Sequence, residues 1–352
     1  MFRFPEDRVY FIAEVGPNHD GSLDKALHIV ERVAASGVDA IKFQTYAAAG
    51  NVVTPEASLA DYMKKGSDSF GGQLELLERV RLSFDDFRQL ATACADLGVA
   101  FVSTPFDEPS VEFIAGLGVP FIKVPSGEIT NRYLLRAAAR TGLPLVVSTG
   151  MAVPEEIAAA LDLVIEDWSQ AGIQAVDRPA VALLHCTSAY PAPHEAANLC
   201  AMATLRDLFG VPVGYSDHTI GWTVPIAATA LGARIIEKHV TPDPNLDGPD
   251  HAASLPIEEL AGLVQAIRST RAALGDGHKR VQPEEEGVKL VARRSLAAAR
   301  PIVKGEFFDE ESLCALRPEN GISPMKAANL CGRAAHRSYK AGELIAKEEL
   351  DT

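Results

Sequence analysis

The chain has 352 residues and a formal net charge of −14, from 33 basic and 47 acidic residues. This length exceeds that of a usual single domain, and 47% hydrophobic with 23% charged residues is an ordinary globular composition. The sequence has no Lys/Arg-rich run and no apolar stretch of membrane-spanning length, so we expect neither a nucleic-acid nor a membrane partner. Its five cysteines form no CxxC pair, and its N-terminal segment lacks the apolar core of a secretion signal. We therefore expect a cytoplasmic protein.

Short apolar runs rich in β-branched residues predict buried parallel strands. They are Tyr10–Val15, Ala40–Thr45, Ala100–Pro105, Phe121–Pro125, Leu145–Thr149, Ala182–Thr187, Pro212–Ser216 and Arg234–Val240. Helical patterns lie between them, at Leu23–Ser36, Ser83–Leu97, Pro154–Asp167, Val224–Leu231 and Pro256–Leu274. Eight strand–helix units in about 275 residues predict an α/β fold, the (β/α)8 TIM barrel. A doubly wound open sheet is the alternative, but the loop Gly16–Gly21 lacks the GxGxxG form that usually follows its first strand.

The composition changes near Gly275, so we assign residues 1–275 to the barrel and the polar residues 276–292 to a linker. Residues 293–352 then form a small, loop-rich second domain. Its apolar pieces are short and are separated by Gly and Pro; they are Ser295–Ala299, Ile302–Val303, Leu313–Leu316 and Leu344–Ile345.

Polar side chains follow nearly every predicted strand, at the end where barrels carry their chemistry. Lys42, Lys123 and Lys238 lie in strands predicted to be buried, where an unpaired ammonium group is costly. In one interpretation each lysine pairs with a carboxylate at the rim of the barrel. We favour a second, in which the three lysines join hydroxyl groups from the third, fourth and fifth strands to bind a phosphate and a carboxylate.

Two histidines, His218 and His239, end the seventh and eighth strands, which are neighbours in a barrel. With Glu14 on the next strand round, they predict a divalent transition-metal site that leaves positions open for water and substrate. The alternative is that each histidine is a hydrogen-bonded structural residue. Asp250 follows the eighth strand, and its position supports a surface turn and a substrate or general-base contact equally.

The segments at the ends of the predicted strands carry a family resemblance. They are Ala13–Gly21, Lys42–Thr45, Ser103–Asp107, Pro125–Asn131, Ser148–Met151, His185–Thr187 with Tyr190–Pro191, Ser216–Thr219 and Glu237–His239. As an ordered set they resemble the bacterial sialic acid synthases, which are phosphoenolpyruvate-dependent nonulosonate synthases. The chain from about Arg293 is similar to the antifreeze-like (SAF) domain that follows the barrel in that family, so the resemblance covers almost the whole chain.

The resemblance implies an enzyme, a transferase that condenses phosphoenolpyruvate with an N-acylated amino hexose and releases phosphate by C–O cleavage. It implies Mn²⁺, with Mg²⁺ or Co²⁺ as alternatives, held by His218 and His239. Glu14 and Glu128 would lie at the sugar and the reacting carbons, and we add Asp250 as a third catalytic candidate. The candidate substrate-binding residues on the barrel are Lys42, Gln44, Thr104, Lys123, Ser126, Ser148, Ser188, Tyr190 and Ser216. Arg317 would reach the sugar's N-acyl group in the partner subunit's site, which implies a domain-swapped homodimer.

Two positions depart from the family pattern. Ser188 stands where some sialic acid synthases carry Asn, and Pro244 replaces an arginine common in the family. The segment Gly127–Asn131 is more similar to legionaminate synthases, whereas Thr187–Pro193 resembles pseudaminate synthases. We therefore keep two acceptors open, N-acetylmannosamine and a 2,4-diacetamido-dideoxyhexose, and favour the second. A metal-dependent pyruvate aldolase on the same barrel is the alternative function.

Overall fold

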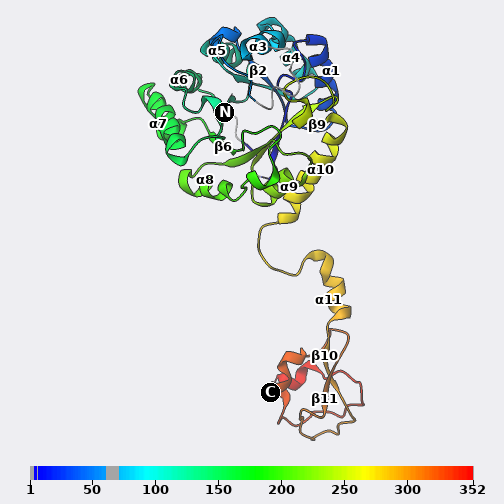
Figure 1. The fold of residues 1–352 in the computed structure, drawn as a ribbon. Helices are drawn as coiled ribbons and strands as arrows, with labels where there is room; N and C mark the ends of the chain where they lie inside the picture. The colour runs from blue at the N-terminus through cyan, green and yellow to red at the C-terminus, as the bar shows by residue number, and fades with distance from the viewer. Residues whose placement is uncertain (1–3, 6, 61–70, 352) are drawn as a thin grey trace. The chain divides into compact units, whose positions relative to one another are not determined.

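The structure is a computed structural model that describes residues 4–5, 7–60 and 71–351. The chain forms two compact units, Met1–Gly275 and Asp276–Thr352. Figure 1 shows the first unit in blue to yellow and the second in orange to red. The division falls where the polar segment after Gly275 begins.

Within the described residues, the first unit is built on eight parallel strands in the order β3-β2-β1-β8-β7-β6-β5-β4. Their bounds are β1 Tyr10–Glu14, β2 Ala40–Thr45, β3 Ala100–Pro105, β4 Ile122–Val124, β5 Leu145–Ser148, β6 Val181–His185, β7 Val213–Asp217 and β8 Ile235–Thr241. Because β3 and β4 also lie next to each other, the sheet is nearly closed. The predicted (β/α)8 barrel is confirmed. The doubly wound alternative was wrong, because closure makes β1 the neighbour of both β2 and β8.

Helices cover the outside of this barrel (Figure 1). They are α1 Leu23–Ala34, α3 Gln73–Val80, α4 Phe84–Asp96, α5 Glu108–Gly116, α6 Arg132–Arg140, α7 Pro154–Gln170, α8 Ala201–Phe209, α9 Thr223–Ala230 and α10 Ile257–Leu274. A short strand, β9 Leu255–Pro256, pairs with the end of β8. Capping side chains close in sequence define where helices begin. At α4, for example, Ser83 and Asp86 form a capping box, and the helix buries Phe87, Leu90 and Cys94.

The strands have apolar side chains on both faces. The outward face packs against the helices in the main core, as Phe11 and Ala13 of β1 do. The inward side chains near the amino ends of the strands form a second cluster inside the barrel, which includes Tyr10 and Ile12 of β1 and Phe121 before β4. Because side chains alternate along a strand, the next inward residue of β1 after Tyr10 and Ile12 is Glu14. The interior therefore changes from apolar to polar toward the carboxyl ends of the strands.

The first α-helix of the second unit is α11, Glu286–Ala292. Its antiparallel strands β10 Ser295–Ala298 and β11 Leu313–Leu316, with the short helix α12 Ala327–Leu330, surround a small core that includes Leu296, Phe308, Tyr339 and Ile345. Bridges between Ala297 and Leu344 and between Ile302 and Tyr339 bring the short apolar pieces together. Across the described parts of both units, no helix is long and apolar enough to cross a membrane.

Candidate active site

The candidate residues of the barrel meet inside it because of strand alternation. On β2, Ala40 packs into the apolar cluster of the interior, so Lys42 and Gln44 face the same way. On β8, Ile235 does the same, so Glu237 and His239 face inward. The result is a ring of buried polar side chains at the carboxyl ends of the strands, which is where barrel enzymes carry their chemistry.

Two of the three predicted lysines lie in this ring. The Nζ atom of Lys42 is 2.7 Å from Oε2 of Glu14 and donates a hydrogen bond of 2.9 Å to Oγ1 of Thr104. The Nζ atom of Lys123 is 3.7 Å from Oε1 of Glu237. Both lysine side chains are at least 96% buried. The ring thus holds two ammonium groups directed toward the interior of the barrel.

Glu237 is a member of the ring that the sequence analysis did not single out. Its Oε1 atom lies 3.8 Å from Nζ of Lys42 and accepts a 2.9 Å hydrogen bond from Ser216. Burial alone would raise the pKa of this carboxyl, but Lys123 and Lys42 outweigh burial and lower it to about 2. Its position two residues before His239 was the available signal, because residues i and i+2 of a strand share a face.

Lys238 does not belong to the anion site, and the prediction that included it was wrong. Its Nζ atom lies 2.6 Å from Oδ2 of Asp217 and donates to the carbonyl of Thr219. Lys238 follows Glu237 directly, so alternation places it on the outer face of β8. All three lysines therefore have a carboxylate partner, as the other interpretation expects, but only Lys42 and Lys123 face the interior of the barrel.

Hydroxyl groups lie around Gly150, just beyond the end of β5. The Oγ atom of Ser126 accepts a 3.0 Å hydrogen bond from the Gly150 amide and is 3.2 Å from Sγ of Cys186. A Cβ atom on Gly150 would lie 2.3 Å from Oγ of Ser188, so any larger residue there must displace neighbouring side chains. The buried Oγ of Ser148 has no hydrogen-bond partner among the described residues. A buried polar atom without a partner is uncommon and is consistent with a ligand that binds at this end of the barrel.

The two histidines leave one nitrogen each for a metal. Nδ1 of His218 is 2.7 Å from the carbonyl oxygen of Thr187, and Nδ1 of His239 is 3.3 Å from Oδ2 of Asp250. The ring centroids are 5.4 Å apart, and the ring of Tyr190 packs on His218 at 4.2 Å. An oxygen at Nδ1 favours the tautomer whose Nε2 carries a free lone pair, as is usual for metal-bound histidines.

The environments of the two imidazoles differ. Burial lowers the pKa of His218 to about 3, and the neighbouring His239 adds to this effect. Burial would also lower the pKa of His239, but the carboxylate of Asp250 outweighs it and raises the pKa. The described residues contain no cluster of three or more His, Cys, Asp or Glu side chains able to hold a metal ion. A metal on these two histidines would therefore keep several coordination positions for water and substrate.

Three further candidates meet next to Gly16. Nε2 of Gln44 donates a 3.1 Å hydrogen bond to Oε1 of Glu14. A Cβ atom on Gly16 would lie 3.2 Å from both of these side chains and 3.4 Å from Oδ2 of Asp250. Burial raises the pKa of Glu14 in spite of the nearby Lys42 ammonium. Glu128 lies in a single-turn helix after β4, where its Oε2 accepts a 2.6 Å hydrogen bond from Asn131.

Arg317 is the one candidate outside the barrel. It lies in the second unit directly after β11, and its side chain is exposed. Its assignment to a sugar site stays a prediction.

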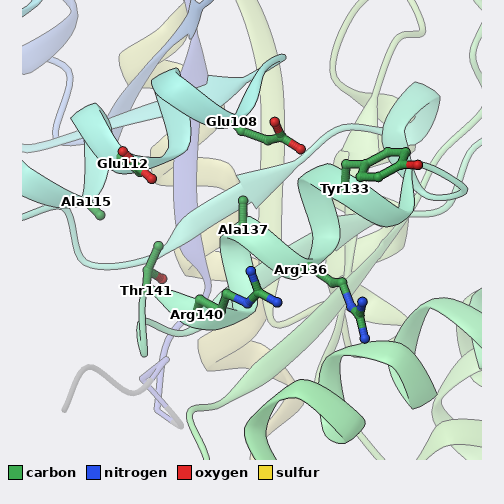
Figure 2. Close-up of a pocket in the computed structure, with 8 residues that line it drawn as sticks. All are labelled: Glu108, Glu112, Ala115, Tyr133, Arg136, Ala137, Arg140 and Thr141. Atoms are coloured by element: carbon green, nitrogen blue, oxygen red, sulfur yellow. The ribbon is translucent and has the colours of Figure 1, made fainter. Parts of the chain in front are cut away.

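A groove of about 670 Å³ lies on the outside of the barrel, between α5 and α6, and does not include the candidate residues. Figure 2 shows Glu108 and Glu112 of α5 on one side of it, and Tyr133, Arg136 and Arg140 of α6 on the other. Arg136 and Arg140 lie 3.1 and 3.7 Å from the carboxylate of Asp167 in α7. These cations therefore hold α6 to α7.

Comparison with known proteins gives a consistent result. The chain is 42% identical to an N,N'-diacetyllegionaminic acid synthase of Legionella pneumophila, over 97% of this chain and 94% of that protein. It is 33% identical to a pseudaminic acid synthase of Campylobacter jejuni, over 98% and 97%. It is 32% identical to the human N-acetylneuraminate-9-phosphate synthase, over 97% and 92%.

Solved structures and family models agree with these relatives. The N-acetylneuraminic acid synthetase of Leptospira borgpetersenii, crystallised with citrate, superposes with a TM-score of 0.67 at 34% identity, over 80% of this chain and 90% of that one. The model of the NeuB family matches residues 29–279, and the model of the SAF domain matches residues 293–351. The chain therefore belongs to the NeuB family, with a SAF domain after its barrel, and is an enzyme of the sialic acid synthase type.

Proposed function

We propose that this enzyme condenses phosphoenolpyruvate with a 2,4-diacetamido-dideoxyhexose to form a nine-carbon keto acid of the legionaminic type. The single observation that carries the phosphoenolpyruvate assignment is the pair of buried ammonium groups, Lys42 and Lys123, in the same barrel interior as the buried Ser148 hydroxyl, which has no hydrogen-bond partner among the described residues. Buried cations with nearby hydroxyl donors suit a small ligand that has both a phosphate and a carboxylate. Thr104, Ser126 and Ser216 would complete its binding site, and Ser188 lies beside it.

The acceptor assignment rests on sequence identity, which is higher to legionaminic acid synthases than to the other synthases compared. The chain is 42% and 41% identical to two N,N'-diacetyllegionaminic acid synthases, but 33% identical to a pseudaminic acid synthase. Identity to the human N-acetylneuraminate-9-phosphate synthase is 32%. N-acetylmannosamine is therefore the second choice. Gln44 and Tyr190, which border Glu14 and the histidines, would contact the bound substrates.

The reaction forms a C–C bond and a C–O bond to water, and breaks the C–O bond to phosphate. C3 of the enol attacks the aldehyde carbon of the open-chain sugar, whose oxygen takes up a proton, and positive charge develops at C2. Water adds to C2 and loses a proton. The C2–O bond to phosphate then breaks, the C2 hydroxyl gives its proton to the leaving phosphate, and C2 becomes the keto carbon. Glu14 suits the base that accepts the proton from water, because burial raises its pKa and so its basicity. Glu128 and Asp250 are the other candidates for proton transfer.

A divalent metal, with Mn²⁺ as first choice and Mg²⁺ or Co²⁺ as alternatives, would be held by Nε2 of His218 and His239. When bound, it would supply a Lewis acid for the aldehyde oxygen. The carbonyl of Thr187 would orient His218, and the carboxylate of Asp250 would orient His239, each from the Nδ1 side of the ring.

We propose further that two chains form a domain-swapped homodimer, in which Arg317 of each SAF domain reaches the acceptor's N-acyl group in the partner's barrel. The barrel and the SAF domain have separate cores, so the link between them does not require that they pack within one chain.

The deciding assay measures phosphate release from phosphoenolpyruvate with Mn²⁺ and each acceptor in turn. We expect release that depends on the diacetamido-dideoxyhexose and yields a keto acid. Preference for N-acetylmannosamine would overturn the acceptor assignment alone. No release from folded, Mn²⁺-loaded protein with either acceptor would overturn the synthase assignment, and condensation with pyruvate in its place would establish the aldolase alternative.

A further inference from the structure

A buried ion pair lies on the outer face of the strands that carry the two histidines. The Nζ atom of Lys238 is 2.6 Å from Oδ2 of Asp217, and both side chains are at least 99% buried. Asp217 and Lys238 are direct partners in the register of β7 and β8. Each residue comes immediately before a histidine of the proposed metal site, Asp217 before His218 and Lys238 before His239.

Thr219 extends this pair to the other side of His218. Oδ1 of Asp217 accepts hydrogen bonds of 3.1 Å from the amide and 2.9 Å from the hydroxyl of Thr219. The carbonyl of Thr219 in turn accepts from Nζ of Lys238. The backbone on both sides of His218 is thus attached to the residue that precedes His239.

A buried ion pair such as Asp217–Lys238 is not needed for the stability of the fold. Removing two charges from water costs several kcal/mol per ion, and well-packed apolar residues of similar volume are often as stabilising as a buried ion pair. An ion pair does, however, accept only one strand register, because a slip of either strand by one residue would turn its own charge to the inside of the barrel and separate it from its partner. The pair therefore provides a fixed geometry that apolar packing provides less strictly.

We propose that Asp217, Lys238 and Thr219 act together as positioning residues, which set the separation and orientation of the His218 and His239 imidazoles and so the affinity for a divalent metal. They touch neither metal nor substrate, because they lie on the opposite face of the sheet from the histidines. The proposal rests on the metal site of the proposed function. It adds that the outer face of the barrel controls how tightly that site binds.

The test uses the full-length double variant Asp217→Leu/Lys238→Met. Removing only one partner would leave a buried charge unpaired and endanger folding, whereas the double variant replaces both charges with apolar groups of similar size. Mn²⁺ affinity is measured from the electron paramagnetic resonance signal of free Mn²⁺, and stability is measured by thermal unfolding without metal. We expect a 10- to 100-fold weaker Mn²⁺ affinity, the usual cost of losing groups that orient metal ligands.

A matched control removes a partly buried ion pair elsewhere. Arg136 and Asp167 join α6 to α7 at 3.1 Å, on the outside of the barrel (Figure 2 shows Arg136). The variant Arg136→Met/Asp167→Leu should keep the wild-type Mn²⁺ affinity. Equal weakening in this control would overturn the proposal, because general loosening of the barrel would then explain both results.

Two further outcomes separate this proposal from the proposed function. If wild type binds Mn²⁺ and His218→Ala abolishes the binding, but the folded Asp217→Leu/Lys238→Met variant binds as tightly as wild type, the positioning role is overturned and the metal site stands. If wild type binds no Mn²⁺, or His218→Ala binds it normally, the metal assignment fails and the positioning role fails with it.

Discussion

At the scale of single residues, Gly150 shows how little space the candidate site leaves. A Cβ atom there would lie 2.3 Å from Oγ of Ser188 and 2.9 Å from both Oγ of Ser126 and Sγ of Cys186. The Gly150→Ala variant must therefore displace these side chains. We expect the KM for phosphoenolpyruvate to rise about 10-fold or more, a loss of roughly 1.4 kcal/mol of binding.

The control for this prediction is Gly116→Ala at the end of α5. A Cβ atom on Gly116 would meet no atom of the described residues within 4 Å. Steady-state kinetics of both variants, with circular dichroism to verify folding, make the comparison. An unchanged KM in Gly150→Ala would show that the Ser126 and Ser188 hydroxyls do not contact the substrate.

His19 predicts a pH dependence of stability. It is 98% buried, its Nδ1 accepts a 3.1 Å hydrogen bond from the Gly21 amide, and burial lowers its pKa to about 4. In the unfolded chain the pKa returns to about 6.5, so between pH 6.5 and 4 the unfolded state binds a proton that the folded state does not. The folded state therefore loses stability as pH falls through this range, by about 2 kcal/mol at pH 5.

The measurement is urea unfolding at pH 7.5 and pH 5 for wild type and His19→Gln. Glutamine offers an oxygen to the Gly21 amide and does not titrate. We expect the variant to lose about 2 kcal/mol less than wild type between the two pH values. Identical losses in the two proteins would contradict the assignment.

At the scale of secondary-structure elements, local chemistry is sufficient to define several helices. The sequence predicts a helix over Ser83–Leu97, and α4 runs from Phe84 to Asp96 with Ser83 as its N-cap. The Oγ of Ser83 accepts from the Asp86 amide, and the Asp86 carboxylate accepts from the Ser83 amide. Such helix ends can be predicted from sequence because the capping side chains and the backbone amides that they bind are at most three residues apart.

The Ser83→Ala variant tests this cap. We expect it to lower the free energy of unfolding by about 1 kcal/mol without changing activity, because the Asp86 amide loses its acceptor far from the candidate site. Thr92→Ala, on the exposed face of the same helix, is the control and should change stability by less than about 0.5 kcal/mol. Chemical denaturation measures both, and equal losses would mean that the cap adds no stability.

The sequence predicts only in part which residues of each strand face the interior of the barrel. Each strand's two faces follow from its sequence, but both faces of these strands are apolar over most of their length, so the pattern does not say which face is the interior. For β8 the sequence analysis therefore placed the wrong residue in the site. It included Lys238, which faces outward, and did not single out Glu237, which faces inward. Closure of the barrel decides the matter, because it brings Glu237 near lysines of β2 and β4.

At the scale of the whole molecule, the anionic substrate that we propose would enter a chain with a net charge of −14. Lys42 and Lys123 provide the local positive charge, and their positions inside the barrel shield them from the acidic surface. Charges in such a buried site interact more strongly than charges in water. The overall negative charge is therefore compatible with the proposed binding of phosphoenolpyruvate.

The proposed dimer can be tested by complementation. His218→Ala and Arg317→Ala chains, each inactive alone, are coexpressed with different tags, and the mixed dimer is purified. If Arg317 acts in the partner's site, one barrel of the mixed dimer has both groups and activity returns to about half that of the wild-type dimer, since one of its two sites is complete. A mixed dimer without activity would show that Arg317 acts within its own chain or not at the site.

The sequence by itself determined the barrel, the bounds of its strands to within two residues, and the residue types that gather where those strands end. These features depend on periodicity, capping and turn chemistry, which act over a few neighbouring residues. Only the tertiary structure decided which lysines face the interior, that Asp250 lies beside His239, and that Asp217 pairs with Lys238 behind the histidines. Those contacts join residues from different strands and loops, and their distances are set by barrel closure and strand register rather than by local sequence.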